Sequence, residues 1–175
     1  MKFYPNAKIR DIIYVEPTVH GDDRGYFFES YHSEKFKENG ISCDLVQDNQ
    51  SRSKKGILRG LHYQLAPKAQ AKLVRVLEGT IFDVAVDIRK ESKTYGQWAG
   101  YTLSAEKHDM LFIPAGFAHG FYVTSELATV MYKCSELYAP ELEQSLIWND
   151  PTLNIKWPID TGPFLSDKDT KAEKF

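Results

Sequence analysis

Short segments in which apolar and polar residues alternate with a period of two are the feature that most constrains the fold of this chain. In residues 80–89, Phe82, Val84, Val86 and Ile88 share one face of the predicted strand, and the residues between them share the other. This period is that of a β-strand, because successive side chains of a strand point to opposite faces of its sheet. Residues 80–89 therefore predict a strand.

The same pattern recurs along the chain. Residues 72–77 predict a strand, and Glu78-Gly79 predicts a tight turn that joins it to the next strand in a hairpin. A short helix is expected between Ser33, which can cap it, and Gly40, which can end it. Further strands are predicted at residues 12–16, 26–30, 60–64, 100–103, 110–113, 119–123, 129–135 and 146–148. Many short strands separated by turns indicate an all-β sandwich or jelly roll.

Composition narrows the classes of function. The 175 residues suit one domain, 1–175, and the net charge of −2 gives no basic surplus to attract nucleic acid or a membrane surface. No apolar run approaches the roughly 18 residues of a membrane span, and the N-terminal segment lacks the apolar core of a signal peptide. Cys43 and Cys134 are too few for a disulfide framework, so a cytoplasmic location is expected.

Polar groups are concentrated in residues 20–29, 47–51, 58–64 and 114–119. His62 lies in an apolar-flanked strand, where a lone histidine commonly has a structural role, but Arg59 and Gln64 nearby also fit a functional site. Arg59 and His62 have opposite strand parity. A β-bulge at Gly60 would turn both side chains to the same side.

A metal site is not expected. Residues 114–119 resemble the second cupin motif, P-x-G-x-x-H, which ends here at His119. Metal-binding cupins also carry an H-x-H pair and a Glu in the first motif, whereas the corresponding residues here are His62, Tyr63 and Gln64. Glutamine is a poor ligand, and two separated histidines do not complete the usual ligand set of a catalytic metal. We therefore expect a cupin-type barrel that uses side chains alone, with no metal and no other cofactor.

Anion binding is open from the residues themselves. Arg24, Arg59 and Lys72 lie among apolar or turn residues, and both side-chain types match phosphate oxygens. Ion pairs with Asp83 or Asp87 fit the sequence equally well.

The tyrosines are also ambiguous. Tyr132, in a predicted strand, suits either the core or a proton-donating role, and spacing does not choose it over Tyr63, Tyr122 or Tyr138.

Together these stretches are similar to the dTDP-4-dehydrorhamnose 3,5-epimerase family. The similarity runs from about residue 12 to residue 169 and consists of long motifs in the family's order. They are DDRGYFFES (22–30), residues 45–64, 72–92, 95–100 and 103–106, IPAGFAHGF (113–121), the pair Tyr132-Lys133, and IWNDPTLNIKWP (147–158).

The resemblance implies a cupin-type jelly-roll β-sandwich with a few short helices. It also implies an isomerase that inverts C3 and C5 of dTDP-4-keto-6-deoxy-D-glucose, giving dTDP-4-keto-L-rhamnose for dTDP-L-rhamnose biosynthesis. By resemblance His62 is the general base, Asp169 the carboxylate paired with it, Tyr132 the general acid and Lys72 the residue near the keto oxygen.

Further positions match substrate contacts of the family. They are Arg24, Glu29, Gln47, Asp48, Asn49, Arg59, His119, Glu143 and Lys168, with Tyr138 and Trp148 as additional candidates. In this family the segment around Arg24 and Glu29 reaches the site of a neighbouring subunit, so a homodimer is implied.

The chemistry explains why such residues are needed. The hydrogens on C3 and C5 both lie α to the C4 ketone, so a base on one face of the sugar and an acid on the other can invert either carbon through an enolate. Three alternatives stay open at this level: a non-catalytic cupin that binds sugars or nucleotides, a metal-dependent cupin isomerase or oxygenase, and an epimerase that inverts a single carbon.

Overall fold

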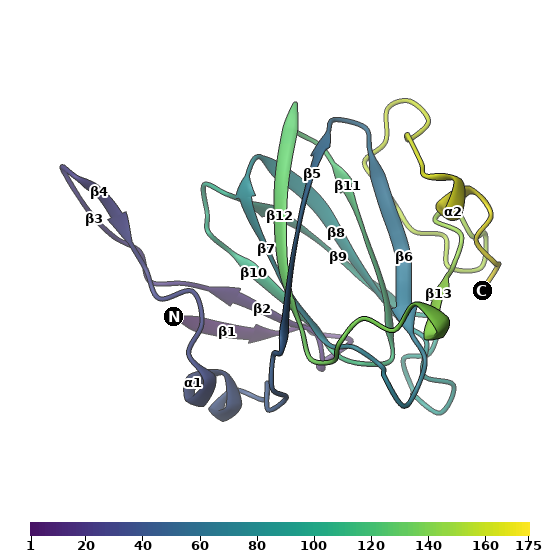
Figure 1. The fold of residues 1–175 in the computed structure, drawn as a ribbon, viewed down its shortest axis with the longest axis horizontal. Helices are drawn as coiled ribbons and strands as arrows, with labels where there is room; N and C mark the ends of the chain where they lie inside the picture. Colours follow the sequence, from purple (N-terminus) through teal and green to yellow (C-terminus); the bar gives the residue numbers. More distant parts are fainter.

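Two antiparallel sheets face each other in the computed structural model, which describes residues 1–175 (Figure 1). In spatial order, the larger sheet contains β1 (Lys2–Pro5), β2 (Ile13–Glu16), β10 (Met110–Ile113), β7 (Lys72–Glu78), β12 (Leu127–Cys134) and β5 (Gln47–Lys54). The smaller sheet contains β13 (Glu143–Ser145), β6 (Leu58–Gln64), β11 (Phe117–Val123), β8 (Thr80–Asp87) and β9 (Trp98–Ser104). The all-β sandwich expected from the alternating pattern is confirmed.

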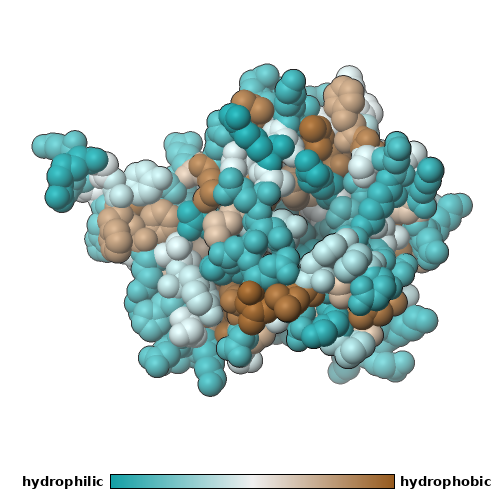
Figure 2. Space-filling view, viewed as in Figure 1, coloured by the Kyte–Doolittle hydropathy of each residue, from teal (hydrophilic) through white to brown (hydrophobic).

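The remaining elements are short. A hairpin of β3 (His20–Asp22) and β4 (Gly25–Phe27) projects from the body at the left of Figure 1, and Figure 2 shows that its tip is hydrophilic. The helical elements are α1 (Ser33–Glu38), the 3₁₀ turn η1 (Pro140–Leu142) and α2 (Asp167–Thr170). Neither α-helix has the length and apolar character that would let it cross a membrane.

Each sheet is covered on both faces. Side chains such as Val74 and Val76 of β7 and Ile81 of β8 fill the space between the sheets. The outer face of the larger sheet packs against α1 through Phe36, and the outer face of the smaller sheet packs against the segment that contains Leu153. Because central strands are buried on both sides, the burial of β8 is nearly continuous along its length.

The two faces of β8 are the reverse of what the alternation alone suggests. Val84 and Val86 pack on the outer face under the C-terminal segment, whereas Ile81 and Ala85 face the space between the sheets. Asp83, which has the parity of Ile81 and Ala85, therefore points into the sandwich and is fully buried. The polar face of this strand lines the interior.

The predicted hairpin of residues 72–89 is wrong in its pairing, although both strands exist. β7 pairs with β10 and β12 in the larger sheet, and β8 pairs with β11 and β9 in the smaller one. Gly79 carries the chain between the sheets: its carbonyl accepts from the Ala105 N–H at 3.0 Å, and the next N–H, of Thr80, donates to Ser125 Oγ at 2.8 Å. An arch prevails because each strand gains two neighbours instead of one.

Other boundaries differ in instructive ways. The strand predicted at residues 146–148 lies earlier, as β13, and Leu146 contributes an isolated bridge to Glu173. The strand predicted at 26–30 is reduced to β4. Strand β5 was not predicted, because its sequence, QDNQSRSK, contains no apolar residue and thus no alternation.

The helix prediction is confirmed in place but not in its cap. Phe36 is fully buried, and Gly40 follows the helix with φ of 90°. Ser33, however, is the first helical residue; His32 occupies the N-cap position and makes no capping hydrogen bond through its side chain.

Gly79→Ala should destabilise the protein. A Cβ at this position would lie 1.9 Å from the Leu127 carbonyl oxygen, and the φ of 78° disfavours any side chain. We expect the free energy of unfolding in urea to fall by about 2 kcal/mol or more. Gly162→Ala is the matched control, because nothing lies within 4 Å of its Cβ position, and it should change stability by less than about 0.5 kcal/mol. Equal stability of the two variants would contradict the arch.

Candidate active site

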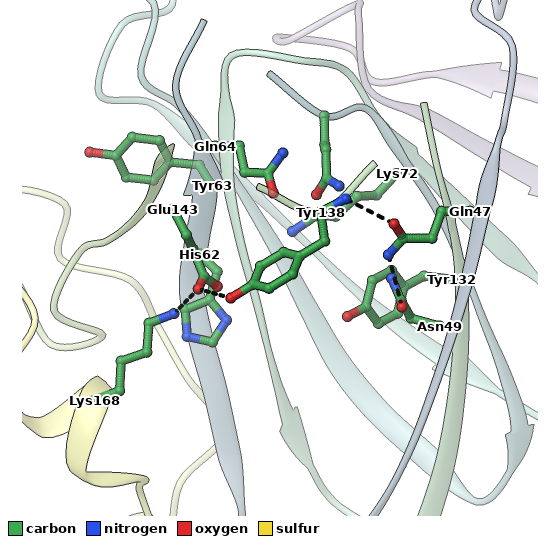
Figure 3. Close-up of a pocket in the computed structure, with 11 residues that line it drawn as sticks. Gln47, Asn49, His62, Tyr63, Gln64, Lys72, Tyr132, Tyr138, Glu143 and Lys168 are labelled. Atoms are coloured by element: carbon green, nitrogen blue, oxygen red, sulfur yellow. Dashed lines mark hydrogen bonds and ion pairs between the residues drawn. The ribbon is translucent and has the colours of Figure 1, made fainter. Parts of the chain in front are cut away.

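A cavity of about 360 Å³ opens at one edge of the sandwich, between the strands of the larger sheet and β6 with β13 of the smaller one (Figure 3). It contains seven of the residues predicted for the site, namely Gln47, Asn49, His62, Lys72, Tyr132, Glu143 and Lys168. Tyr63, Gln64, Gln70 and Tyr138 complete its lining.

A β-bulge in β6 shapes the floor of this cavity. His62 lies opposite His119 on β11, but Arg59 lies opposite Phe121, so β6 contains one residue more than its partner over this stretch. Gly60 occupies the bulge with φ of 126°, where a Cβ would lie 2.4 Å from the Gly120 Cα. The predicted bulge is therefore confirmed.

The bulge brings Arg59 and His62 to the same side. His62 lines the cavity, and Arg59 Nε donates to Ser53 Oγ of β5 at 3.0 Å, so its side chain reaches towards the larger sheet.

His62 is held by Asp169 of α2. The His62 Nε2 and Asp169 Oδ1 atoms are 2.5 Å apart, and the carboxylate also accepts hydrogen bonds from Ser166 Oγ and from the backbone N–H of Gly60. Burial acts to raise the pKa of Asp169, but the bonds from His62, Ser166 and Gly60 outweigh burial and lower this pKa below its ordinary value. An ionised carboxylate only accepts hydrogen bonds, so Nε2 of His62 carries the ring proton and Nδ1 keeps a free lone pair. His62 is thus arranged as a base.

Tyr132 and Lys72 come from the opposite sheet. They lie on β12 and β7, and Lys72 Nζ is 5.9 Å from the centre of the Tyr132 ring. Burial, followed by the neighbouring Cys134, raises the pKa of Tyr132, so its phenol is protonated at neutral pH and can donate a proton. Lys72 makes no hydrogen bond or ion pair within the protein, which leaves its amine available to an oxygen of a ligand.

Tyr138 links the two sides of the cavity mouth. Its backbone N–H donates to Gln47 Oε1 of β5 at 2.8 Å, and its hydroxyl donates to Glu143 Oε2 of β13 at 2.7 Å (Figure 3). Glu143 in turn forms an ion pair with Lys168 of α2. The mouth therefore carries a chain of polar contacts that a ligand with several hydroxyl or phosphate oxygens can join or replace.

Gln64 has a structural role that its sequence position did not reveal. It is buried, its amide nitrogen donates to the carbonyls of Lys68 and Leu137, and its oxygen accepts from the Ala139 N–H. The residue at the second position of the H-x-H pattern thus fixes two loops. No three or more His, Cys, Asp or Glu side chains gather in a way that could hold a metal ion.

Two predicted contacts lie outside the cavity wall. His119 is buried beneath it, with Nε2 at 2.7 Å from Asp83 Oδ1. Asp48 occupies the face of β5 opposite to Gln47 and Asn49 and pairs with Lys133 at 2.9 Å, so this chain's own cavity does not contain it. Trp148 follows β13 and is likewise absent from the lining; its carbonyl accepts from the Trp157 indole N–H.

The N-terminal contacts are remote. Arg24 is exposed at the tip of the β3–β4 hairpin, where it pairs with Asp22, and Glu29 pairs with Lys35 at 2.7 Å. Neither reaches the cavity within one chain.

The ion-pair alternative for the three cations is not observed. Asp83 binds His119, and Asp87 binds Arg89.

Sequence reasoning did not select Gln70 and gave no reason to prefer Tyr63. Gln70 donates to the Glu136 carbonyl at 2.8 Å, a contact for which the local sequence carries no signal. Proximity to His62 was the one clue to Tyr63.

Comparisons with known proteins agree with this geometry. A family model described as dTDP-4-dehydrorhamnose 3,5-epimerase matches residues 6–175. The chain is 54% identical to a protein of that name from Pseudomonas aeruginosa, over 95% of this chain and 92% of the relative. The structure of the Legionella pneumophila epimerase RmlC in complex with dTDP-4-keto-L-rhamnose superposes with a TM-score of 0.95 at 49% identity, covering 99% of this chain and 92% of the other. ChmJ, a 3'-monoepimerase from Streptomyces bikiniensis solved with dTDP-quinovose, superposes with a TM-score of 0.91 at 36% identity, covering 98% and 86%.

Asp169→Asn should remove a pH-dependent part of the stability. Because the pKa of Asp169 is lowered in the folded state, its contribution is present above the unfolded pKa of about 3.9 and is lost as the pH falls through the folded pKa. At pH 6 we expect the variant to unfold with a free energy about 1–3 kcal/mol lower than wild type, and the gap to narrow towards pH 2. Asp167→Asn, an exposed aspartate of the same helix, should show no such gap in urea titrations. A gap for Asp169→Asn that does not change with pH would contradict the assignment.

Proposed function

The chain belongs to the dTDP-4-dehydrorhamnose 3,5-epimerase family, and from this premise we propose that it inverts C3 and C5 of dTDP-4-keto-6-deoxy-D-glucose to give dTDP-4-keto-L-rhamnose. The product serves dTDP-L-rhamnose biosynthesis. The observation that supports the assignment most directly is that His62 and Tyr132 line one cavity from opposite sheets.

The first step is removal of a proton from C3 or C5. His62 Nδ1 takes the proton, since Nε2–H is bonded to Asp169. The carboxylate then stabilises the imidazolium that forms, as a buried hydrogen-bonded aspartate does in other acid–base pairs. The carbon acid is far weaker than imidazolium, so this pair cannot account for the step alone.

Charge on the enolate oxygen needs a partner. Lys72, which has no partner in the protein, stands in the cavity as the donor for that oxygen. Removing one preorganised donor of this kind typically costs about 2.7–4 kcal/mol of transition-state stabilisation. Tyr132 returns a proton from the side of the larger sheet, and the carbon inverts because its proton leaves towards one sheet and arrives from the other.

Binding of the nucleotide falls to residues nearer the mouth. Arg59 provides a fork for diphosphate oxygens, and the amides of Gln47 and Asn49 provide hydrogen bonds. Glu143 and Lys168 lie where sugar hydroxyls can replace their mutual ion pair. These roles follow from position in the cavity and from the chemistry of each side chain.

The projecting hairpin supports a homodimer. Tyr26 and Phe27 are 64% and 72% exposed on it, an unusual exposure for adjacent large aromatic residues. A second copy of the chain would bury them and would bring Arg24 and Glu29 to the neighbouring site. The active site is then built from two subunits. The thiols of Cys43 and Cys134 are free, which is consistent with the cytoplasm as its location.

His62→Ala should abolish exchange at the sugar. In heavy water, with dTDP-4-keto-6-deoxyglucose followed by NMR, wild type should incorporate deuterium at C3 and C5, and His62→Ala should lose both exchanges by about 100-fold or more because the base is gone. Tyr132→Phe keeps the base, so it should retain exchange while losing inverted product.

Wild-type rates of exchange in His62→Ala would overturn the assignment of the base. Exchange at C3 alone in wild type would show a single-carbon activity like that of ChmJ.

Mixing two inactive variants tests the shared site. Arg24→Ala lacks the residue donated to the neighbour, and His62→Ala lacks the base, so a mixed dimer holds one intact site. After co-refolding in equal amounts we expect about one quarter of the wild-type activity, since half of the dimers are mixed and each has one good site of two. Each variant refolded alone is the control. Activity of the mixture no greater than the mean of the two controls would contradict a composite site.

A further inference from the structure

A buried carboxylate lies beneath the cavity and takes no part in the mechanism described so far. Asp83, on the inward face of β8, is fully buried. Its Oδ1 accepts from His119 Nε2 at 2.7 Å, but its Oδ2 has no hydrogen-bond partner in the protein. A buried carboxylate oxygen without a partner is costly, so its retention calls for an explanation in terms of function.

His119 does not neutralise this carboxylate. Burial is the largest influence on its pKa and lowers it, and nearby Lys72 and His62 lower it further. The imidazole is therefore neutral near pH 7, and it holds Oδ1 by a hydrogen bond without supplying a positive charge. The negative charge of Asp83 remains available to another group.

Lys72 is that group. It is buried, burial is the main cause that lowers its pKa, and it forms no ion pair. The titratable and charged groups that face it are Tyr132 and Cys134 of β12, Asp83 of β8, His119 of β11, His62 of β6, Glu143 of β13 and Lys168 of α2.

Two of these groups are anionic candidates besides Asp83, and neither is equivalent to it. Burial raises the pKa of the Cys134 thiol, which keeps that group neutral at pH 7. Glu143 already pairs with Lys168 and accepts from Tyr138 at the cavity mouth. Asp83 is thus the one fully buried carboxylate near Lys72 that is not paired with another cation.

We propose that Asp83 is a positioning residue, held in place by neutral His119, whose unpartnered oxygen keeps Lys72 protonated so that Lys72 can stabilise the enolate. This inference rests on the proposed epimerase function for its consequence, but the electrostatic link between Asp83 and Lys72 can be measured without substrate. The wall of the cavity thus carries the charged donor, and the layer beneath it sustains that charge.

The test is an NMR titration of the full-length protein labelled with ¹³C at the lysine Cε. The Lys72 signal is assigned by its disappearance in Lys72→Arg. In Asp83→Asn we expect the Lys72 midpoint to fall by about one pH unit or more, the size expected for loss of a nearby opposite charge. The alkaline limb of the kcat profile should move in the same direction, whereas a purely structural role for Asp83 would leave this limb in place.

Two comparisons sharpen the result. Glu143→Gln also removes a carboxylate that faces Lys72, but a smaller shift is expected because Glu143 is paired with Lys168. Asp83→Glu keeps the charge and should restore most of the midpoint. An unchanged Lys72 midpoint in folded Asp83→Asn would overturn the proposal.

The wild-type titration decides the matter if Asp83→Asn does not fold. A Lys72 midpoint above about 8 supports the proposal, and one below about 7 overturns it, because the amine would then be neutral at working pH. If Lys72 responds as expected but no deuterium exchange occurs at the sugar, the proposed function fails and the electrostatic link stands. The reverse pair of results separates the two claims in the other direction.

Discussion

The hydrogen bond between His62 and Asp169 joins the two parts of the chain that must meet for the site to exist. His62 lies on a bulged strand in the middle of the sequence, and Asp169 lies on a four-residue helix near its end. The bulge residue Gly60 gives Asp169 a further backbone hydrogen bond, so the distortion that turns His62 inward also anchors its partner. The orientation of the base and the docking of the C-terminal segment are therefore a single structural event.

The interior of the sandwich changes character along its length. Over most of its extent it is filled by apolar side chains such as Val76, Ile81 and Leu111. At the edge near β5 and β6, the same inward positions hold Lys72, Tyr132 and His62. A low-dielectric surrounding strengthens electrostatic interactions and makes unpaired charges costly. This explains how burial can hold the Tyr132 phenol protonated while each charge in the site needs a counterpart.

The mouth and the hairpin extend the site outward. Tyr138 connects the two sheets through Gln47 and Glu143, which places an exposed aromatic ring at the entrance. The β3–β4 hairpin points away from the body and carries Arg24 beyond reach of its own cavity (Figure 1). A site completed by a second subunit accounts for both features, since one chain alone leaves the entrance open and the hairpin uncovered.

By itself the sequence determined the strands with apolar alternation, the short helix around Phe36, the bulge at Gly60 and, through family resemblance, the roles of His62, Tyr132, Lys72 and Asp169. Local pattern suffices for these because side-chain period and glycine conformation are properties of short segments. The tertiary structure decided the rest: that β7 and β8 belong to different sheets, that the all-polar β5 is a strand, and that Asp83 faces inward rather than out. Those outcomes depend on which distant segment covers each face and fills each hydrogen-bond ladder, a competition among contacts far apart in the chain that no short stretch of residues records.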